Sequence, residues 1–135
     1  MASIRSRKVQ TTWKCSLKEL DQIGKVRRKD VDWAHHVCKV SRAAHLRVWF
    51  ETLPGDFVSE IIHQLESLAA QMTAIKGTQV YLRNVNIRIR SLNNYLEGKL
   101  PVLPPDATDE ERKILEQIEK YRRPIREAIA SGVEG

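Results

Sequence analysis

Histidine and cysteine side chains that could bind a metal ion or act as a nucleophile gather in one stretch of the chain. His35, His36, Cys38 and His45 lie close together in the sequence, and imidazole and thiolate groups are preferred ligands of Zn²⁺. Their spacing matches no standard zinc site, in which ligands about two to four residues apart occur in two clusters. A cysteine nucleophile with a histidine base needs the same side chains, but no local signature of such an enzyme accompanies them. We therefore predict no metal, no cofactor and no catalytic residue, with Cys38 as a small, partly buried side chain.

Motifs of the common enzyme classes do not occur elsewhere in the sequence. It contains no phosphate-binding loop, dinucleotide fingerprint, HExxH pair or nucleophile elbow. The paired acids Glu110 and Glu111 stand at a predicted helix start, so we expect them to face water as capping residues. The sequence thus predicts a protein that is not an enzyme.

Positive charge is concentrated in the first third of the chain. Residues 1–47 carry 12 Lys and Arg against 4 Asp and Glu, whereas residues 48–135 carry 11 against 13. Such asymmetry is typical of a chain that contacts nucleic acid, an anionic membrane surface or an acidic protein. The alternative is that the basic part docks on the acidic part of its own chain or of a sister chain.

Lysine and arginine follow two patterns that suit the phosphates of a nucleic-acid backbone. One is the run at residues 25–29, which could also be a solvated linker, and the other is a row on one side of a predicted helix, opposite its apolar face. Cations in such rows supply affinity without sequence specificity. The predicted nucleic-acid-binding residues are Lys25, Arg27, Arg28, Lys29, His35, Lys39, Arg42, Arg88 and Arg90.

Helices are expected to position these residues, because apolar side chains recur at helical spacing through most of the chain. Ser16 and Glu19 form a capping box for a short helix that ends near Gly24. Asp30 can cap a second helix that reaches to about Thr52. The apolar face of this second helix consists of Trp33, Val37, Val40, Ala44 and Val48.

A turn at residues 53–56 separates the second helix from the longest apolar stripe of the chain. Pro54 and Gly55 favour a reversal there, and Asp56 can cap the next helix. Apolar side chains then continue at helical spacing, which predicts one long central helix at about 57–97 in an antiparallel hairpin. Its second half has no predicted partner, so we expect the C-terminal helix, a second copy of the chain or another protein to cover it. The predicted interface residues are Leu82, Val85, Ile89, Leu92 and Leu96.

Residues 80–90 also allow a different interpretation. β-Branched residues alternate with polar ones there, which places Val85, Ile87 and Ile89 on one side of a possible strand. Because a lone strand cannot satisfy its own backbone and the sequence offers no convincing second strand beyond the strand-like residues 9–15, we favour a helix.

The chain has the length of one domain. Its predicted parts are a basic arm at residues 1–15, a helical core at 16–98, a proline-rich connector at 99–108 and a C-terminal helix at 109–131. The predicted fold class is all-α: an elongated helical hairpin or bundle with one long central helix, an extended N-terminal arm and a C-terminal helix kinked at Pro124.

Cysteine content and the N-terminal residues indicate the compartment. Two cysteines are too few for a disulfide framework, and the N-terminus lacks the apolar core of a signal peptide. No apolar run approaches the ~20 residues of a membrane span. We expect an intracellular protein, cytoplasmic or nuclear, although the basic, acid-free residues 1–18 are also typical of a mitochondrial presequence.

Charge and periodicity together predict a non-enzymatic helical protein that self-associates, as a homodimer, and binds RNA or DNA through the phosphate backbone in a sequence-tolerant way. The alternative is a helical adaptor or assembly subunit that binds another protein through the long apolar stripe. A third possibility is a peripheral membrane protein that uses the N-terminal charge on anionic lipids.

Overall fold

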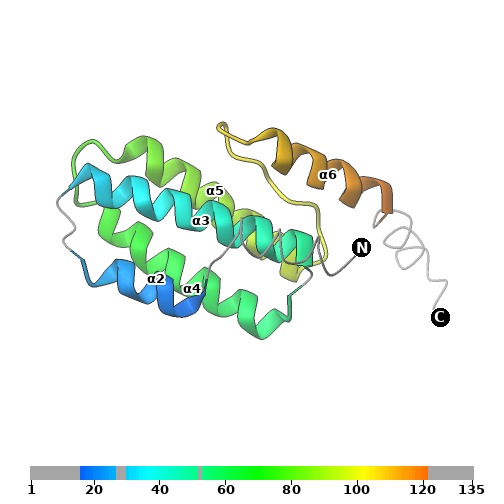
Figure 1. Ribbon diagram of the computed structural model, residues 1–135, viewed down its shortest axis with the longest axis horizontal. Helices are drawn as coiled ribbons and strands as arrows, with labels where there is room; N and C mark the ends of the chain where they lie inside the picture. Colours follow the sequence, from blue (N-terminus) through cyan, green and yellow to red (C-terminus); the bar gives the residue numbers. More distant parts are fainter. Residues whose placement is uncertain (1–15, 27–29, 52, 122–135) are drawn as a thin grey trace, which may run out of the picture.

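Five α-helices make up the part of the chain that the computed structural model describes, which is residues 16–26, 30–51 and 53–121 (Figure 1). In chain order they are α2 (Leu17–Gly24), α3 (Val31–Glu51), α4 (Gly55–Met72), α5 (Gln79–Leu96) and α6 (Asp109–Tyr121). The described ranges contain no strand, so the predicted all-α class is confirmed, and residues 80–90 are helical.

Helices α2 to α5 form an up-and-down bundle, and α6 lies outside it (Figure 1). Successive helices run in opposite directions, so that α3 and α5 are parallel neighbours in one layer and α2 and α4 are parallel neighbours in the other. After α5 the connector at residues 99–108 turns back along this bundle before α6 begins (Figure 1). Among the helices, α6 approaches α3.

Side-chain caps begin three of the helices at the predicted positions. Ser16 Oγ accepts a hydrogen bond from the Glu19 N–H at 3.2 Å, and Asp30 Oδ1 accepts one at 3.0 Å from the N–H two residues further on. At the start of α6, Thr108 Oγ1 accepts from the Glu111 N–H at 3.1 Å, and Glu111 Oε1 accepts from the Thr108 N–H at 3.0 Å. Each bond satisfies a helix-terminal N–H that has no acceptor within its helix.

The chain reverses at residues 53–56, between α3 and α4, but Asp56 is not the cap. Pro54 stands at the N-cap position in an extended conformation, and α4 already begins at Gly55. The Tyr95 hydroxyl donates to the Leu53 carbonyl oxygen at 2.8 Å. This bond ties the turn to the end of α5.

The single long helix predicted at residues 57–97 is wrong. The chain leaves the helix after Met72 and re-enters it at Gln79, so that α4 and α5 become antiparallel neighbours. Gly77 adopts φ +83°, a left-handed conformation that favours glycine, and the Thr78 hydroxyl hydrogen-bonds the Met72 and Ile75 carbonyl oxygens at 2.8 and 2.9 Å. The reversal lets the two halves of the apolar stripe pack on each other, whereas a straight helix would leave one half in water.

Gly98 ends α5, as predicted, through a Schellman motif. It adopts φ +75°, its N–H donates to the Tyr95 carbonyl oxygen at 3.1 Å, and the Lys99 N–H donates to the Asn94 carbonyl oxygen at 2.8 Å. This pattern satisfies the last carbonyl groups of the helix and directs the connector away from its axis.

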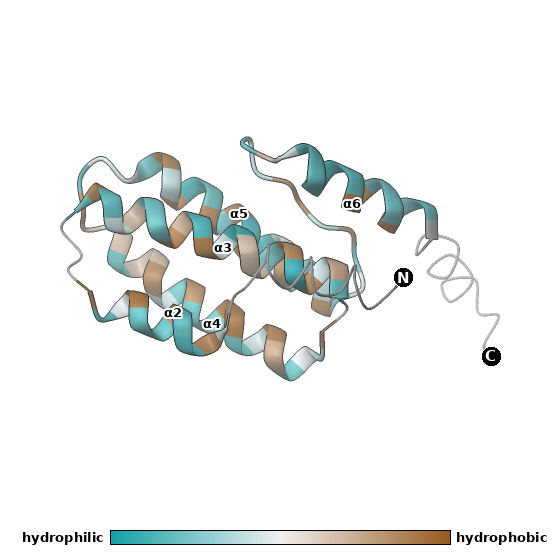
Figure 2. Cartoon of the chain, in the orientation of Figure 1, coloured by the Kyte–Doolittle hydropathy of each residue, from teal (hydrophilic) through white to brown (hydrophobic). Residues whose placement is uncertain are grey.

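The main core fills the space between α2, α3, α4 and α5. Hydrophobic and hydrophilic residues alternate along each helix in the way that amphipathic helices require (Figure 2). The Trp33 indole N–H donates to the Ile23 carbonyl oxygen at 2.7 Å and thereby joins α3 to the end of α2. The predicted apolar face of α3 is buried in this core through Trp33, Val37, Val40, Ala44 and Val48.

A second, smaller apolar cluster attaches α6 to α3. Figure 2 shows α6 as mostly hydrophilic with a few hydrophobic positions. The buried members of this cluster are Leu46 and Trp49 from α3 and Ile114 and Ile118 from α6. Within the described ranges, no helix combines the length and the apolar character that crossing a membrane requires.

Several predicted features lie outside the described residues. They are the arm at residues 1–15, the centre of the basic run at 27–29, and the part of the C-terminal helix beyond Tyr121 with the kink at Pro124.

Candidate functional site

Arg88 points into the protein and meets acceptors from α3 and the connector. Its side chain is fully buried. Nη1 donates to the Cys38 carbonyl oxygen and to Cys38 Sγ, both at 3.3 Å, and to Ser41 Oγ at 3.4 Å. Nη2 donates to Asp106 Oδ1 at 3.1 Å. In this arrangement the guanidinium group of Arg88 reaches protein acceptors and no part of the surface.

Arg42 meets the same carboxylate from α3. Its Nη2 donates to Asp106 Oδ2 at 2.6 Å and to the Asp106 carbonyl oxygen at 2.9 Å. The two oxygens of one carboxylate therefore bind two arginines that belong to different helices. Bonds between guanidinium and carboxylate are charge-assisted and geometrically specific, so they fix the connector at this point.

Glu111 lies in the first turn of α6 and is buried, although the sequence predicts that it faces water. One reason is that the capping bond to Thr108 turns its side chain back toward the bundle, where the carboxylate meets three nitrogen atoms. Arg42 Nε lies 3.6 Å from Oε1, and His45 Nδ1 and Arg88 Nε lie 3.2 and 4.0 Å from Oε2. None of these three nitrogens has a hydrogen-bond partner, and neither has Oε2. The attraction is therefore electrostatic without good hydrogen-bond geometry.

His45 connects Glu111 to the end of the bundle core. Its Nε2 lies 2.8 Å from Ser91 Oγ, which also accepts a hydrogen bond from the Trp49 indole N–H at 3.0 Å. The serine hydroxyl can then donate its one hydrogen to Nε2, which leaves the Nδ1 hydrogen of a neutral imidazole directed at Glu111. With this tautomer, Ser91 Oγ can donate a hydrogen bond to His45 Nε2 and accept the one from the Trp49 indole N–H.

The environment keeps His45 neutral and Glu111 ionised. Burial lowers the pKa of His45 below its ordinary value, because the imidazolium would lose its hydration, and the contacts with Glu111 oppose this effect without reversing it. Burial acts to raise the pKa of Glu111, but the contact with His45, the bond from Thr108 and the charge of Arg88 outweigh it and leave the pKa below its ordinary value. A neutral imidazole thus lies beside an ionised Glu111.

Ser91, His45 and Glu111 have the connectivity of a serine hydrolase triad. The serine and histidine are within hydrogen-bond distance, and the carboxylate lies against the other ring nitrogen. A nucleophile must also reach a substrate, but the Ser91 side chain is fully buried and already accepts the Trp49 N–H. We therefore interpret the arrangement as a structural connection between α3, α5 and α6.

We call Arg42, His45, Arg88, Asp106 and Glu111 the ionic cluster. All the basic members belong to α3 and α5, whereas both acids belong to the connector and α6. Together with the small apolar cluster, these contacts hold residues 99–121 on the bundle. Across the described residues, no group of three or more His, Cys, Asp and Glu side chains is arranged to hold a metal ion.

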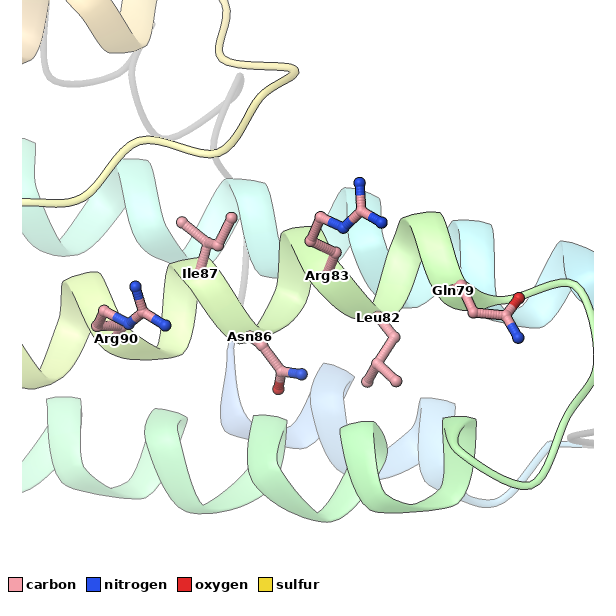
Figure 3. A pocket seen from close by; sticks show the side chains of 6 residues that line it. All are labelled: Gln79, Leu82, Arg83, Asn86, Ile87 and Arg90. Atoms are coloured by element: carbon pink, nitrogen blue, oxygen red, sulfur yellow. The ribbon is translucent and has the colours of Figure 1, made fainter.

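A second candidate site is a shallow pocket along the outside of α5 (Figure 3). Arg83, Asn86 and Arg90 are exposed there, and Leu82 and Ile87 are half-buried. Figure 3 shows Arg83 and Ile87 on the side of α5 opposite to Leu82 and Asn86, which are directed toward α4. We call the lining residues the α5 outer face: Gln79, Leu82, Arg83, Asn86, Ile87 and Arg90.

The other predicted nucleic-acid-binding residues are spread over the molecule. Lys25 is exposed and pairs with Asp21 at 3.0 Å. On α3, Lys39 is exposed, and the exposed His35 makes an edge contact with the Tyr81 ring of α5, with ring centroids 5.4 Å apart. The structure thus brings Arg42 and Arg88 together at Asp106 and leaves Arg90 on the α5 outer face.

The predicted interface residues pack mostly inside the chain. Val85 and Leu92 are fully buried, Ile89 is nearly so, and Leu82 is half-buried against the main core. Leu96 is 41% exposed. The second half of the stripe is therefore covered by α3 and α4 of the same chain.

Sequence reasoning missed Asp106 and Arg83 and misplaced Glu111. The capping box identified Glu111 as a helix-start residue, but its burial depends on where α6 docks. Arg83 could have been found from its spacing, because it lies seven positions before Arg90 and so falls on nearly the same side of a helix.

Comparisons of the chain with protein families, with curated proteins and with solved structures return no match.

Proposed function

We propose that this protein is a non-enzymatic helical protein that binds the phosphate backbone of RNA or DNA, chiefly through the α5 outer face. The observation that carries the proposal is the composition of α5, which contains three arginines and no acidic residue. Two of them, Arg83 and Arg90, extend from its exposed side together with the amide side chains of Gln79 and Asn86. Guanidinium and amide donors are the groups that commonly contact phosphate and sugar oxygens.

Of the helices α4 and α5, only α5 supplies cations to this side of the molecule. Its neighbour α4 carries Asp56, Glu60 and Glu66 and no Lys or Arg, so phosphate binding here depends on the arginines of α5. Arg83 and Arg90 are separated by about 10 Å along the helix axis. One helix can thus contact phosphates at two points on a strand or duplex without reading bases.

Cations on other elements complete the proposed surface. Lys39 and His35 on α3 and the run at residues 25–29 remain candidate contacts, as the sequence predicts. The interface of the proposed homodimer has to consist of exposed residues, because Val85 and Leu92 are buried in the core of the same chain. The intracellular location, cytoplasmic or nuclear, stays part of the proposal.

A helical adaptor is the alternative function, and one observation favours it. Leu82 and Ile87 stand among the arginines of the α5 outer face and are half-buried. A face that mixes Arg with aliphatic side chains is also typical of protein interfaces, where Arg is enriched. The partner would be an acidic protein.

The double variant Arg83→Glu with Arg90→Glu tests the proposed function. We expect fluorescence anisotropy with a single-stranded RNA and a duplex DNA to show weak, salt-sensitive binding by the wild type. In the variant, binding should be lost at about 50 mM salt, because two phosphate contacts are replaced by repulsion. In the wild type, two such contacts should contribute a slope of about −1.8 for duplex DNA and about −1.4 for single-stranded RNA to the plot of log affinity against log salt concentration.

The matched control is Arg112→Glu with Lys113→Glu, which makes the same charge change on exposed residues of α6. If both double variants lose binding equally, affinity follows net charge and the α5 outer face is not the site. If the wild type binds neither ligand at low salt, the proposed function fails and the adaptor becomes the better interpretation.

A further inference from the structure

The ionic cluster divides its charges between two parts of the molecule. Arg42 and Arg88 project from adjacent helices, and the acids that neutralise them come from residues 99–111. Without that segment, the bundle would present two guanidinium groups close enough to share a single carboxylate. A pair of this kind is a site for an oxyanion, and Asp106 is the oxyanion that fills it.

The two arginines are not fully satisfied by their present partners. The Nε atoms of Arg42 and Arg88 are buried and have no hydrogen-bond acceptor. Carboxylate oxygens of Glu111 lie 3.6 Å from Arg42 Nε and 4.0 Å from Arg88 Nε. A buried donor without an acceptor is destabilising, because it has lost its hydrogen bonds to water. The site therefore offers more donors than two carboxylates in these positions can use.

We propose that Arg42 and Arg88 form a masked phosphate-binding site, and that a phosphate group of the nucleic acid displaces the Asp106 carboxylate from it. This inference rests on the proposed function for its ligand and adds a second contact point to the α5 outer face. A phosphate presents more oxygens than a carboxylate, in a tetrahedral arrangement, and it accepts bidentate hydrogen bonds from guanidinium groups.

Access requires only a local movement. Arg88 is fully buried, but the Asp106 side chain above it is 40% exposed and the Arg42 side chain 30%. Asp106 lies in a turn closed by the hydrogen bond from the Ala107 N–H to the Pro104 carbonyl oxygen at 3.0 Å. Displacing this turn opens the arginine pair while Glu111 and α6 stay docked.

Inorganic phosphate and Asp106→Ala test the site without a nucleic acid. Removing the carboxylate leaves the arginine pair without its main anion, so the variant should have a lower Tm than the wild type in chloride. Phosphate should then raise the Tm of Asp106→Ala by at least about 3 °C more than it raises that of Glu110→Ala, at equal ionic strength. Glu110 is the control because it is an exposed acid on the same segment. Equal shifts in the two variants would overturn the proposal.

Asp106→Asn covers the case in which Asp106→Ala does not fold. It keeps the shape of the side chain and removes the charge that competes with phosphate. Its expected affinity for RNA is about fivefold tighter than that of the wild type at low salt. The double variant Asp106→Asn with Arg42→Gln should return to the wild-type affinity or below. An unchanged affinity for Asp106→Asn would overturn the masking role of Asp106.

The outcomes separate this inference from the proposed function. If phosphate stabilises Asp106→Ala selectively but no variant binds RNA or DNA, the anion site stands and the proposed function fails. If RNA binding depends on Arg83 and Arg90 but does not respond to Asp106→Asn, the proposed function stands and the inference fails.

Discussion

The α3–α5 layer is held on its two sides by different forces. Toward α2 and α4 the contact is apolar and continuous, with Leu65, Val85 and Leu92 fully buried. Toward the connector and α6 it consists of the ionic cluster and of a small apolar cluster built around Trp49 and Ile118. The first contact thus resembles the core of a domain, whereas the second resembles the contact between a protein and a ligand bound to its surface.

The two contacts have different roles: the apolar contact stabilises the fold, and the ionic cluster fixes the position of the connector and α6. Burial of apolar surface stabilises the fold by about 25 cal/mol per Å² and depends little on exact geometry. A buried ion pair recovers little more than its dehydration cost, but loss of one partner leaves a buried charge without compensation. We therefore expect changes in the apolar contact to lower the stability of the whole domain and changes in the ionic cluster to release residues 99–121 first.

Leu65→Ala is expected to have the largest effect, a loss of about 3 kcal/mol in the free energy of unfolding, because it removes buried methyl groups and leaves a cavity. Urea denaturation followed by circular dichroism measures it. The matched control is Leu115→Ala on the half-buried side of α6, for which we expect a loss below about 1 kcal/mol. Similar losses for both variants would contradict the distinction between the two contacts.

Glu111→Gln is expected to cost less, about 2 kcal/mol, because it keeps the acceptor for Thr108 and removes the charge that faces Arg42, Arg88 and His45. Hydrogen exchange should accelerate in α6 and leave α4 protected. Glu110→Gln makes the same chemical change at an exposed position and should alter neither helix. Faster exchange throughout the bundle would mean that the ionic cluster supports the core as well.

Acid should weaken the docked side of the molecule before the core. Because the pKa of His45 is lowered in the folded chain, the unfolded chain takes up a proton near its ordinary value of 6.5 and the folded chain does not. Stability therefore falls as the pH drops below 6.5, by at most about 1.4 kcal/mol per pH unit for this one proton. Glu111, whose pKa is also lowered, adds a loss of the same sign below about pH 4.5.

His45→Gln is the control for this pH dependence. Removing the imidazole should flatten the stability profile between pH 6.5 and the range in which carboxylates titrate. If wild type and variant lose stability in parallel there, His45 does not cause the slope.

Local residues were sufficient to predict where most helices begin and end, because caps and breakers act within one turn. Ser16, Asp30, Thr108 and Gly98 all have the predicted roles. The reversal after Met72 was not recognised, because the apolar spacing continues through it and only Gly77 and Thr78 differ. A periodic apolar stripe predicts which side of a helix is buried. It does not predict whether that side packs against a different helix or against the next part of the same stripe after the chain has reversed.

The ionic cluster could not be predicted, because its charges come from distant segments. Arg88 and Asp106 are separated by 18 positions and Arg42 and Asp106 by 64. Arg88 and Arg90 are both arginines and lie two positions apart, but helix geometry directs their side chains to different sides of α5. The sequence identified Arg42 and Arg88 as basic residues and allowed the basic part of the chain to dock on the acidic part, but it did not indicate that these two arginines meet Asp106 and Glu111.

Gly98 joins the two differently held parts, and its substitution should have the smallest effect. An added Cβ would meet no atom within 4 Å, so the cost of Gly98→Ala comes from φ +75° alone and amounts to about 1 kcal/mol. Gly24→Ala at the end of α2 is the matched comparison: its Cβ would make an ordinary contact 3.5 Å from Leu68 Cδ2, and the helical backbone favours alanine by up to about 1 kcal/mol. Thermal unfolding of the two variants should therefore shift in opposite directions, with the loss at Gly98 accompanied by faster hydrogen exchange in α6. Destabilisation by both would show that the space around Gly24, rather than backbone conformation, decides the sign.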